Sequence, residues 1–452
     1  MRGWNCAMAA VQPNCNRSFP RPRPTVFILF LIVLTLASAK YGEWLFERWF
    51  NPLTCYAAGW GVSLIACELR LIQYFWISDT AWLYIAVSYV AVFGGGTLGV
   101  WANRELVSNH PSANFADALK PWILVLTGLA AVALVVEFRQ TLAAYGSLLE
   151  VYANSNEIYS RRMAGDFAAF SYLSYLVFPA SALAGAYTAR KRCITLIGAL
   201  PIVDLVLMSA ISMQRMGPIF AGLLFGIAFA YSPRSGKLIL SRKMAVGIVA
   251  IGVAAIATFA AVSSFRGLFE AFPKQSAGLT RSSEYITTLP SNYMYLSAPV
   301  PAFSYYLLHP QFEQPLFGGF TFAPAYRLLS KVGFRTQVAQ YTTFFTVPAE
   351  VNQATYLAYI HSDFGAAGIF LIPMLLGVVT GWLGSSIVLD FHLAKLMLFS
   401  HLFLVLMWSF SGYIVMFPHW LVSLVVSVSV GYYVESLPRS SALAAREAVS
   451  AT

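Results

Sequence analysis

The stretch TAWLYIAVSYVAVFGGGTLGVW, residues 80–101, carries no charged side chain and indicates the fold class. It is long enough for a helix that crosses the hydrocarbon core of a bilayer, which takes about 20 apolar residues. Similar apolar runs recur along the chain. We expect spanning helices near residues 26–39, 53–76, 80–101, 122–138, 167–187, 194–211, 217–231, 245–262, 366–389, 396–416 and 420–434. The chain is therefore predicted to form about 11 transmembrane helices.

The composition supports the same fold class. Hydrophobic residues make up 58% and charged residues 11% of the 452 residues, and the mean hydropathy is +0.66. Soluble domains have roughly 45–50% apolar and about 25% charged residues. These values exclude a soluble globular enzyme and a disordered chain, and the long apolar runs exclude a barrel of alternating strands. We predict an all-α polytopic membrane protein without internal repeats.

The charge and the cysteines give little support to nucleic acid, metal or cofactor. The net charge is +10, which fits basic cytoplasmic loops and attraction to anionic lipids. The longest basic run is 190–192, so no nucleic-acid partner is expected. The five cysteines show no C-x-x-C, and the chain has no phosphate-binding loop, no G-x-S-x-G and no D-x-D. We expect neither a metal ion nor a cofactor.

Basic residues in short loops predict the orientation. Arginines and lysines at 190–192 and 234–243 should be cytoplasmic, which places 139–166 and the long stretch 266–351 outside. The expected organisation is an N-terminal tail (1–24), a bundle of about 8 helices (25–265), a large periplasmic loop (266–351), about 3 further helices (352–434) and a cytoplasmic tail (435–452).

The N-terminal region conflicts with this orientation. The same alternation places residues 1–24 outside, although they carry four arginines, Arg2, Arg17, Arg21 and Arg23. A basic region, a short apolar core and the A-S-A sequence at 37–39 are also typical of a cleavable signal peptide. Cleavage would invert every later span against its charges, so we expect an uncleaved first helix.

The stretch 266–351 is rich in aromatic residues. It includes YMYLSAPVPAFSYYLLHP (293–310) and LFGGFTFAPAYRLLSKVGFRT (316–336). Aromatic rings stack on sugars, and they also lie at membrane interfaces. Short amphipathic helices on the outer leaflet would satisfy both interpretations. The candidate sugar contacts are Tyr293, Tyr295 and Asn352.

Arginines at the predicted outer face form a second group of candidates. Guanidinium groups bind phosphate in a bidentate manner and stay charged, so converging arginines would bind a lipid-linked diphosphate. The alternatives are lipid headgroup anchoring and ion pairs with Glu137, Asp166 or Glu350. The candidates are Arg162 (with its neighbour Arg161), Arg215, Arg266 and Arg327.

Polar residues crowd the entrance to the span near 366–389, in VNQATYLAYIHSDFGAAG (351–368). His361 and Asp363 are two positions apart, so on a helix they would diverge, whereas a turn before Gly365 would let them converge. An imidazole or a carboxylate can accept a proton from a sugar hydroxyl. The candidate bases are His361, Asp363 and Glu350, and a structural role for His361 is the alternative.

Three features inside the spans need a separate interpretation. A carboxylate at the bilayer centre costs on the order of 3 kcal/mol, so Asp204 must face protein, water or a partner, in a packing or a catalytic role. Glu68 and Arg70 are predicted to make separate contacts rather than one ion pair. The run Gly94–Gly95–Gly96 favours close helix packing over phosphate binding.

Several of these segments together resemble the oligosaccharide repeat-unit polymerases, the Wzy-type O-antigen or exopolysaccharide polymerases. The segments are FNPLTCYAAGW (50–60), ISDTAWLYIAVSYVAVFGGG (77–96), QRMGPIFAGLLFG (214–226) followed by FRG (265–267), LFGGFTFAPAYRLL (316–329) and NQATYLAYIHSDFGAAG (352–368). The resemblance runs over most of the chain. It implies a GT-C-like membrane fold, shared more loosely with O-antigen ligases and peptidoglycan-polymerising glycosyltransferases.

The resemblance also implies a reaction and partners. A glycan on undecaprenyl diphosphate would be transferred to a new lipid-linked repeat unit at the periplasmic leaflet of the bacterial inner membrane. Arg215 and Arg266 match the family's outer-face arginines. A chain-length regulator and a flippase are the expected partners, together with the lipid-linked donor and acceptor. An O-antigen ligase of related fold and a glycan transporter remain the alternative functions.

Overall fold

The computed structural model describes most of the chain between Pro24 and Leu437 and shows it to be mostly helical. Two short antiparallel strands, β1 (Phe345–Thr346) and β2 (Glu350–Val351), pair Phe345 with Val351. The described residues are 24–72, 74, 77–103, 115–154, 157–158, 171–212, 216–233, 253, 257, 290–309, 317–331, 333, 345–347, 350–351 and 353–437.

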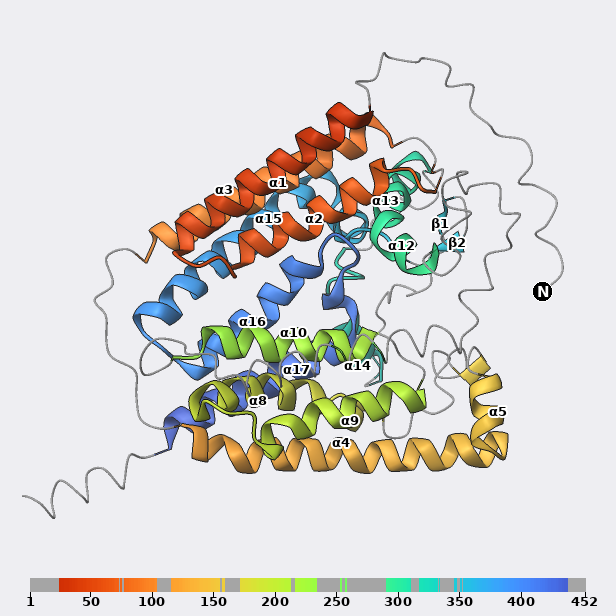
Figure 1. Cartoon of the computed structure of the whole chain (residues 1–452), viewed down its shortest axis with the longest axis vertical. Coiled ribbons are helices and arrows are strands. Elements are labelled where there is room, and N and C mark those ends of the chain that lie inside the picture. The colour runs from red at the N-terminus through yellow and green to blue at the C-terminus, as the bar shows by residue number, and fades with distance from the viewer. Residues whose placement is uncertain are drawn as a thin grey trace, which may run out of the picture.

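The long helices form two groups that lie side by side (Figure 1). One group contains α1 (Pro24–Phe46), α2 (Pro52–Glu68), α3 (Asp79–Trp101) and α15 (Tyr356–Leu389). The other contains α4 (Ala116–Tyr145), α8 (Val177–Lys191), α9 (Leu196–Ser212), α10 (Met216–Tyr231) and α17 (Pro418–Ser436). Helix α16 (Leu393–Trp408) lies between the groups, and each group has its own buried apolar cluster.

Within the described part of the chain, four helices are long and apolar enough to cross a membrane: Thr25–Phe46, Asp79–Trp101, Ala116–Tyr145 and Tyr356–Leu389. Shorter apolar helices cover Leu196–Ile211, Met216–Tyr231 and Leu393–Trp408. The prediction of a helical membrane protein is confirmed to this extent.

Two predicted spans differ from the observed helices in detail. The one near 53–76 ends at Glu68, and the one near 167–187 is interrupted between α7 (Ser171–Ser174) and α8. The span near 245–262 lies almost wholly outside the described residues.

Local sequence explains where several of these helices begin. The Asn51 side chain accepts a hydrogen bond from the Thr54 amide at 2.9 Å, and Pro52 occupies the first turn of α2. Ser78 caps α3 in the same way, with the acidic Asp79 in its first turn. Side-chain caps satisfy amides that have no partner inside the helix. These helices therefore start where the sequence supplies a cap before an apolar run.

The interpretation of the glycine run as a packing surface is confirmed. A Cβ atom on Gly95 would lie 2.2 Å from the carbonyl oxygen of Met374, and one on Gly99 would lie 2.1 Å from that of Val378. Gly377 on α15 faces α3 in return, where a Cβ atom would lie 2.4 Å from the Val92 carbonyl oxygen. Helices α3 and α15 thus approach backbone to backbone, which small residues permit in membrane proteins.

The prediction for Glu68 and Arg70 is wrong, because the two side chains form an ion pair. Arg70 Nη2 lies 3.7 Å from Glu68 Oε2. Residues two apart diverge only where the helix continues, and α2 ends at Glu68. Arg70 has a positive φ of 50°, so the chain turns back toward the last helical residue.

Asp204 is buried in the middle of α9.

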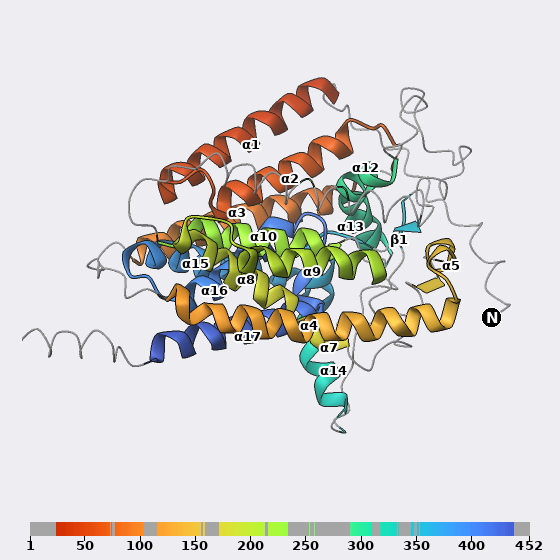
Figure 2. The ribbon, with the colours of Figure 1, turned by 60° about the horizontal axis from the view of Figure 1, so that its bottom comes forward.

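The bundle has two distinct ends (Figures 1 and 2). One, which we call the loop end, carries α5 (Leu148–Ala153), α12 (Pro290–Ser297), α13 (Pro299–Leu308), α14 (Ala323–Lys331) and the two strands. Helix α4 runs toward this end with Arg139 in its last turns. Helix α8 ends at the opposite end with Arg190 and Lys191. The two groups predicted to lie on opposite sides of the membrane are therefore at opposite ends of the bundle.

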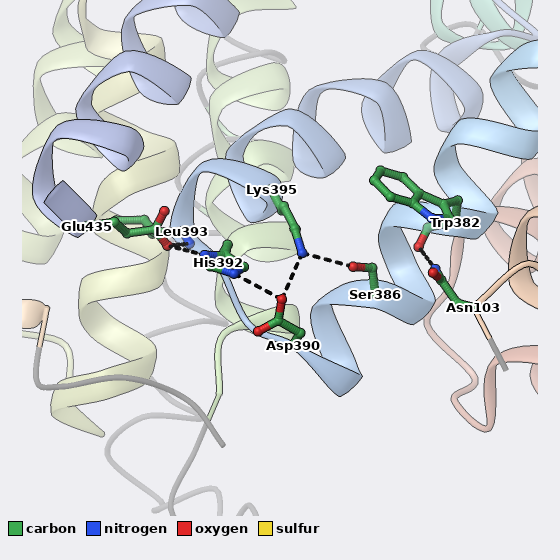
Figure 3. Close-up of polar contacts among 8 residues, drawn as sticks. All are labelled: Asn103, Trp382, Ser386, Asp390, His392, Leu393, Lys395 and Glu435. Carbon is green, nitrogen blue, oxygen red and sulfur yellow. Dashed lines mark hydrogen bonds and ion pairs between the residues drawn. The ribbon is translucent and has the colours of Figure 1, made fainter. Parts of the chain in front are cut away.

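The opposite end carries a charged cluster, the clasp, formed by Asp390, His392, Lys395 and Glu435 (Figure 3). Asp390 Oδ2 lies 3.1 Å from Lys395 Nζ and 3.0 Å from His392 Nε2. Glu435 Oε1 lies 3.5 Å from His392 Nδ1 and accepts a hydrogen bond from the Leu393 amide. The glutamate of α17 therefore caps the first turn of α16, and the clasp joins the ends of α15, α16 and α17.

Replacing Asp390 by asparagine is expected to reduce the free energy of unfolding by on the order of 1 kcal/mol at neutral pH, the scale of partly exposed ion pairs. Burial alone would raise the pKa of the Asp390 carboxyl, but the hydrogen bond from Lys395 and the charges of Lys395 and His392 hold that pKa below its ordinary value. A lowered pKa in the folded state stabilises the protein above the carboxyl's ordinary pKa, and this stabilisation is lost as the pH falls through the folded-state pKa. The difference in melting temperature should therefore shrink between pH 7 and about pH 3.

The control is Glu43→Gln, which removes a carboxylate that pairs with Lys40 at an exposed site on α1. This change should have a smaller effect at every pH. A difference between the wild-type protein and Asp390→Asn that is equally large at pH 7 and pH 3 would contradict the expected role of the Asp390 carboxylate.

Candidate functional site

Helix α15 is broken near its start, at the loop end of the bundle. Gly365 has φ 64° and ψ −160°, which separates a first part, 356–364, from the long part that follows. The first part begins after Thr355, which has an extended backbone. The Tyr356 amide donates a hydrogen bond to the Ser409 carbonyl at 3.0 Å. Gly365 is half-buried, and membrane proteins tolerate a non-helical backbone within a long apolar helix where protein or a water-filled cavity surrounds it.

Asp363 faces the segment 317–321 that precedes α14. Its Oδ1 accepts a hydrogen bond from the Phe320 amide at 2.9 Å. Its Oδ2 accepts from the Thr321 amide at 2.7 Å and from the Thr321 hydroxyl at 2.6 Å. Asp363 is 1% exposed, so these three donors satisfy a buried carboxylate. We call this set of contacts the Asp363–Thr321 contact.

Tyr413 completes that contact from the connection between α16 and α17. Its hydroxyl lies 3.2 Å from Thr321 Oγ1. A threonine hydroxyl has one proton, which the carboxylate of Asp363 accepts, so Tyr413 donates to Thr321. The contact therefore joins α15, the segment before α14 and the α16–α17 connection.

His361 faces a different set of neighbours. Its Nδ1 lies 3.1 Å from the hydroxyl of Tyr306 on α13, and its ring packs against Tyr306 and Tyr84 with centroids 5.7 and 5.5 Å apart. The helix continues through residue 364, so His361 and Asp363 point in different directions. Of the two arrangements left open by the sequence, the divergent one is observed, because the break follows both residues.

The contact between His361 and Tyr306 bears on proton transfer. A neutral imidazole carries its proton on one nitrogen and a lone pair on the other. When Nδ1 donates to the Tyr306 hydroxyl, Nε2 is left with the lone pair that can accept a proton. The tyrosine is 4% exposed and belongs to a buried cluster, so it holds the ring in a fixed direction.

Tyr293 and Tyr295 attach α12 to the bundle. The Tyr293 hydroxyl donates to the carbonyl of Ala66 on α2, and burial raises the pKa of Tyr293 to about 12. The Tyr295 carbonyl accepts a hydrogen bond at 3.3 Å from Ser411, which in turn accepts one at 2.8 Å from Gln353. Both tyrosines are half-buried at the loop end.

The structure describes two of the remaining candidate site residues, Arg327 and Glu350. Arg327 is half-buried on α14, where its carbonyl accepts a hydrogen bond at 2.8 Å from the Ser330 hydroxyl. The backbone of Glu350 pairs with Thr346 in the two-stranded sheet. The other four candidates, Arg162, Arg215, Arg266 and Asn352, lie outside the described residues. Within the described part of the chain, no three histidine, cysteine, aspartate or glutamate side chains lie close enough to hold a metal ion.

The structure adds site residues that sequence reasoning did not single out: Tyr84, Tyr306, Thr321 and Tyr413. One signal for Thr321 was present in the pair Gly318–Gly319 just before it, since Gly318 has a φ of 83° that favours glycine. The three tyrosines had no distinguishing signal among the 24 of this chain.

Comparison of the chain with protein-family models, with curated proteins and with solved structures finds no match.

Proposed function

We propose that the protein is a membrane glycosyltransferase that polymerises undecaprenyl-diphosphate-linked oligosaccharide repeat units, for O-antigen or exopolysaccharide synthesis. In this proposal the chain has the GT-C-like polymerase fold with about eleven transmembrane helices. The main support for this proposal is the placement of His361. It lies on the buried first part of the broken helix α15, where the hydroxyl of Tyr306 on α13 contacts its Nδ1. It lies at the end of the bundle where the elements of the aromatic stretch 290–351 gather.

The proposed reaction needs a base and a charge-neutralised leaving group. Nε2 of His361 takes the proton of the acceptor hydroxyl as its oxygen bonds to C1 of the donor sugar, and the bond from C1 to the diphosphate oxygen breaks. Arg215 and Arg266 bind the departing diphosphate, with Arg162 and Arg327 as further candidates. Preorganised positive charge at a developing anion is an effective way to stabilise a transition state.

The geometry favours His361 over the other two candidate bases. The Asp363 carboxylate already accepts three hydrogen bonds and is 1% exposed. We therefore assign it the role of holding the segment 317–321 in position. Glu350 is the alternative base. Tyr293, Tyr295 and Asn352 would line the path of the sugars.

The proposed location is the bacterial inner membrane, with the loop end facing the periplasm. Arg190 and Lys191 lie at the opposite end, and basic residues in short loops favour the cytoplasmic side. In this orientation a flippase would supply the lipid-linked repeat unit from the cytoplasmic leaflet, and a chain-length regulator would act on the growing polymer.

A reconstitution experiment tests the proposal. The purified protein, supplied only with a lipid-linked repeat unit, should produce a ladder of longer glycans. Arg215→Ala and Arg266→Ala should each abolish the ladder and leave the single repeat unit, because the diphosphate would leave without a neutralising charge. Arg139→Ala, at an exposed position on the loop-end part of α4, is the matched control and should retain the ladder. Normal long polymer from both site variants would overturn the assignment.

The same experiment distinguishes the alternatives. Transfer only to a lipid A core identifies an O-antigen ligase. Movement of the lipid-linked unit across the bilayer without a new bond identifies a transporter, a class in which broken helices are common. The break in α15 is the observation that favours a transporter. However, it lies near one end of the helix, whereas transporter breaks lie near the midplane.

A further inference from the structure

Helix α14 differs in direction from the long helices of the bundle. It follows the Asp363–Thr321 contact directly, since Thr321 is two positions before its first residue. In Figure 2 it points away from the bundle, across the direction of α4 and α17. Among the described elements its main neighbour is α17. Its direction is thus the one that a helix lying in the plane of the membrane would take.

The depth of α14 follows from α15. The part of α15 after the break, 366–389, is about 36 Å long at 1.5 Å per residue, which is enough to cross a hydrocarbon core of about 30 Å. Asp363 lies just before this part, and Tyr413 lies beyond the loop end of α16. Thr321 contacts both residues. Helix α14 therefore starts at the boundary between hydrocarbon and headgroups on the loop side.

The surface of α14 matches that boundary. Phe322 and Leu329 are 49% and 39% exposed, and Phe317 just before the helix is 77% exposed. Ala325, Tyr326 and Leu329 share one face by helical spacing, whereas Arg327 and Ser330 lie on the other. A short helix with an apolar face, aromatic residues and basic residues on its polar face is typical of interfacial membrane helices.

We propose that α14 with Phe317 and Phe322 is a lipid-binding surface that lies in the headgroup layer of the loop-end leaflet, and that the Asp363–Thr321 contact holds it at that depth. The lipid bilayer is favoured over a protein partner as the occupant because α14 packs on α17, whose apolar Val425 is 54% exposed, and starts beside the end of α15, which is long and apolar enough to cross a membrane. This proposal does not depend on glycosyl transfer, so it can fail or hold independently of the proposed function.

Depth-dependent quenching in lipid nanodiscs tests the proposal. A bimane label is placed at Leu329→Cys in a variant whose five native cysteines are alanine and whose melting temperature shows that it folds. Lipids brominated close to the headgroup should quench this label about twofold more strongly than lipids brominated near the chain end, since interfacial helices lie about 5–10 Å into the bilayer. Val425→Cys should show the reverse order. Leu149→Cys, 80% exposed on α5, should show little quenching.

A second variant tests the role of the contact. Asp363→Asn should reduce shallow quenching of the Leu329 label, because the amide group of asparagine offers a donor where the amide and hydroxyl of Thr321 need an acceptor. Deep quenching at Val425 should be unchanged in a correctly folded variant. A Leu329 label that neither lipid quenches, as in water or under a protein partner, would overturn the proposal. Unchanged shallow quenching in a folded Asp363→Asn protein would overturn the role of the contact.

Discussion

Replacing His361 by glutamine is expected to lower the rate of glycan chain extension by about 10²–10⁴-fold, the usual contribution of a general base. Glutamine is similar in size and can keep a hydrogen bond to Tyr306, so the helix around it should stay intact. It lacks a nitrogen that can accept a proton from the acceptor hydroxyl. The loss should therefore appear in kcat rather than in KM for the lipid-linked unit, because binding does not require proton transfer.

Two further variants sharpen the test of His361. Tyr306→Phe removes the hydroxyl that lies 3.1 Å from Nδ1 and should cause an intermediate loss, since the ring remains but its direction is less well fixed. His309→Gln is the matched control. Its Nδ1 lies 2.7 Å from the Tyr305 carbonyl within the same helical turn, and its replacement should leave the rate unchanged. A His361→Gln protein with a normal rate would remove His361 from the mechanism and leave Glu350 as the candidate base.

Replacing Gly95 by alanine should destabilise the protein strongly. The added Cβ atom would lie 2.2 Å from the Met374 carbonyl oxygen, which belongs to backbone and cannot rotate away. Helices α3 and α15 must separate to relieve this contact, and overpacking of a close-packed interior costs about 1–3 kcal/mol for a single site. Adding Gly99→Ala, where the contact is 2.1 Å from the Val378 carbonyl oxygen, should prevent recovery of a folded monomer from detergent.

Gly94→Ala is the matched control for this prediction. A Cβ atom on Gly94 meets nothing within 4 Å, and the residue is exposed on the same helix. Alanine favours a helix over glycine by about 1 kcal/mol, so this variant should melt at the same temperature or slightly higher. Equal melting temperatures for the Gly94 and Gly95 variants would contradict the backbone-to-backbone packing of α3 on α15. The comparison is measured by thermal unfolding in detergent.

Much of the helical architecture could be predicted from local pattern. The apolar run at 80–101 forms α3 at Asp79–Trp101, and Gly95 and Gly99 within it mark the surface that packs on α15. Helix boundaries were harder to predict from the sequence where polar contacts determine them. The span expected near 366–389 begins ten residues earlier, at Tyr356, because its first part is buried in protein and continues as helix before Gly365.

The ion pair between Arg70 and Glu68 shows why local spacing misleads at a helix end. The separation of two positions predicts divergence inside a helix, but a single residue with a positive φ reverses the chain. The candidate site shows the same limit. Its sequence pattern left open whether His361 and Asp363 converge, and the position of the break at Gly365 decided that they do not.

The amino-acid sequence alone predicts a helical membrane protein, because run length and apolar content are properties of neighbouring residues. Which polar groups meet depends on the packing of the folded chain. Tyr413 lies 92 positions from Thr321, and Tyr306 lies 55 positions from His361. Contacts over such separations depend on how helices pack against one another. Buried hydroxyl, imidazole and carboxylate groups then pair with the donors and acceptors that packing brings within reach.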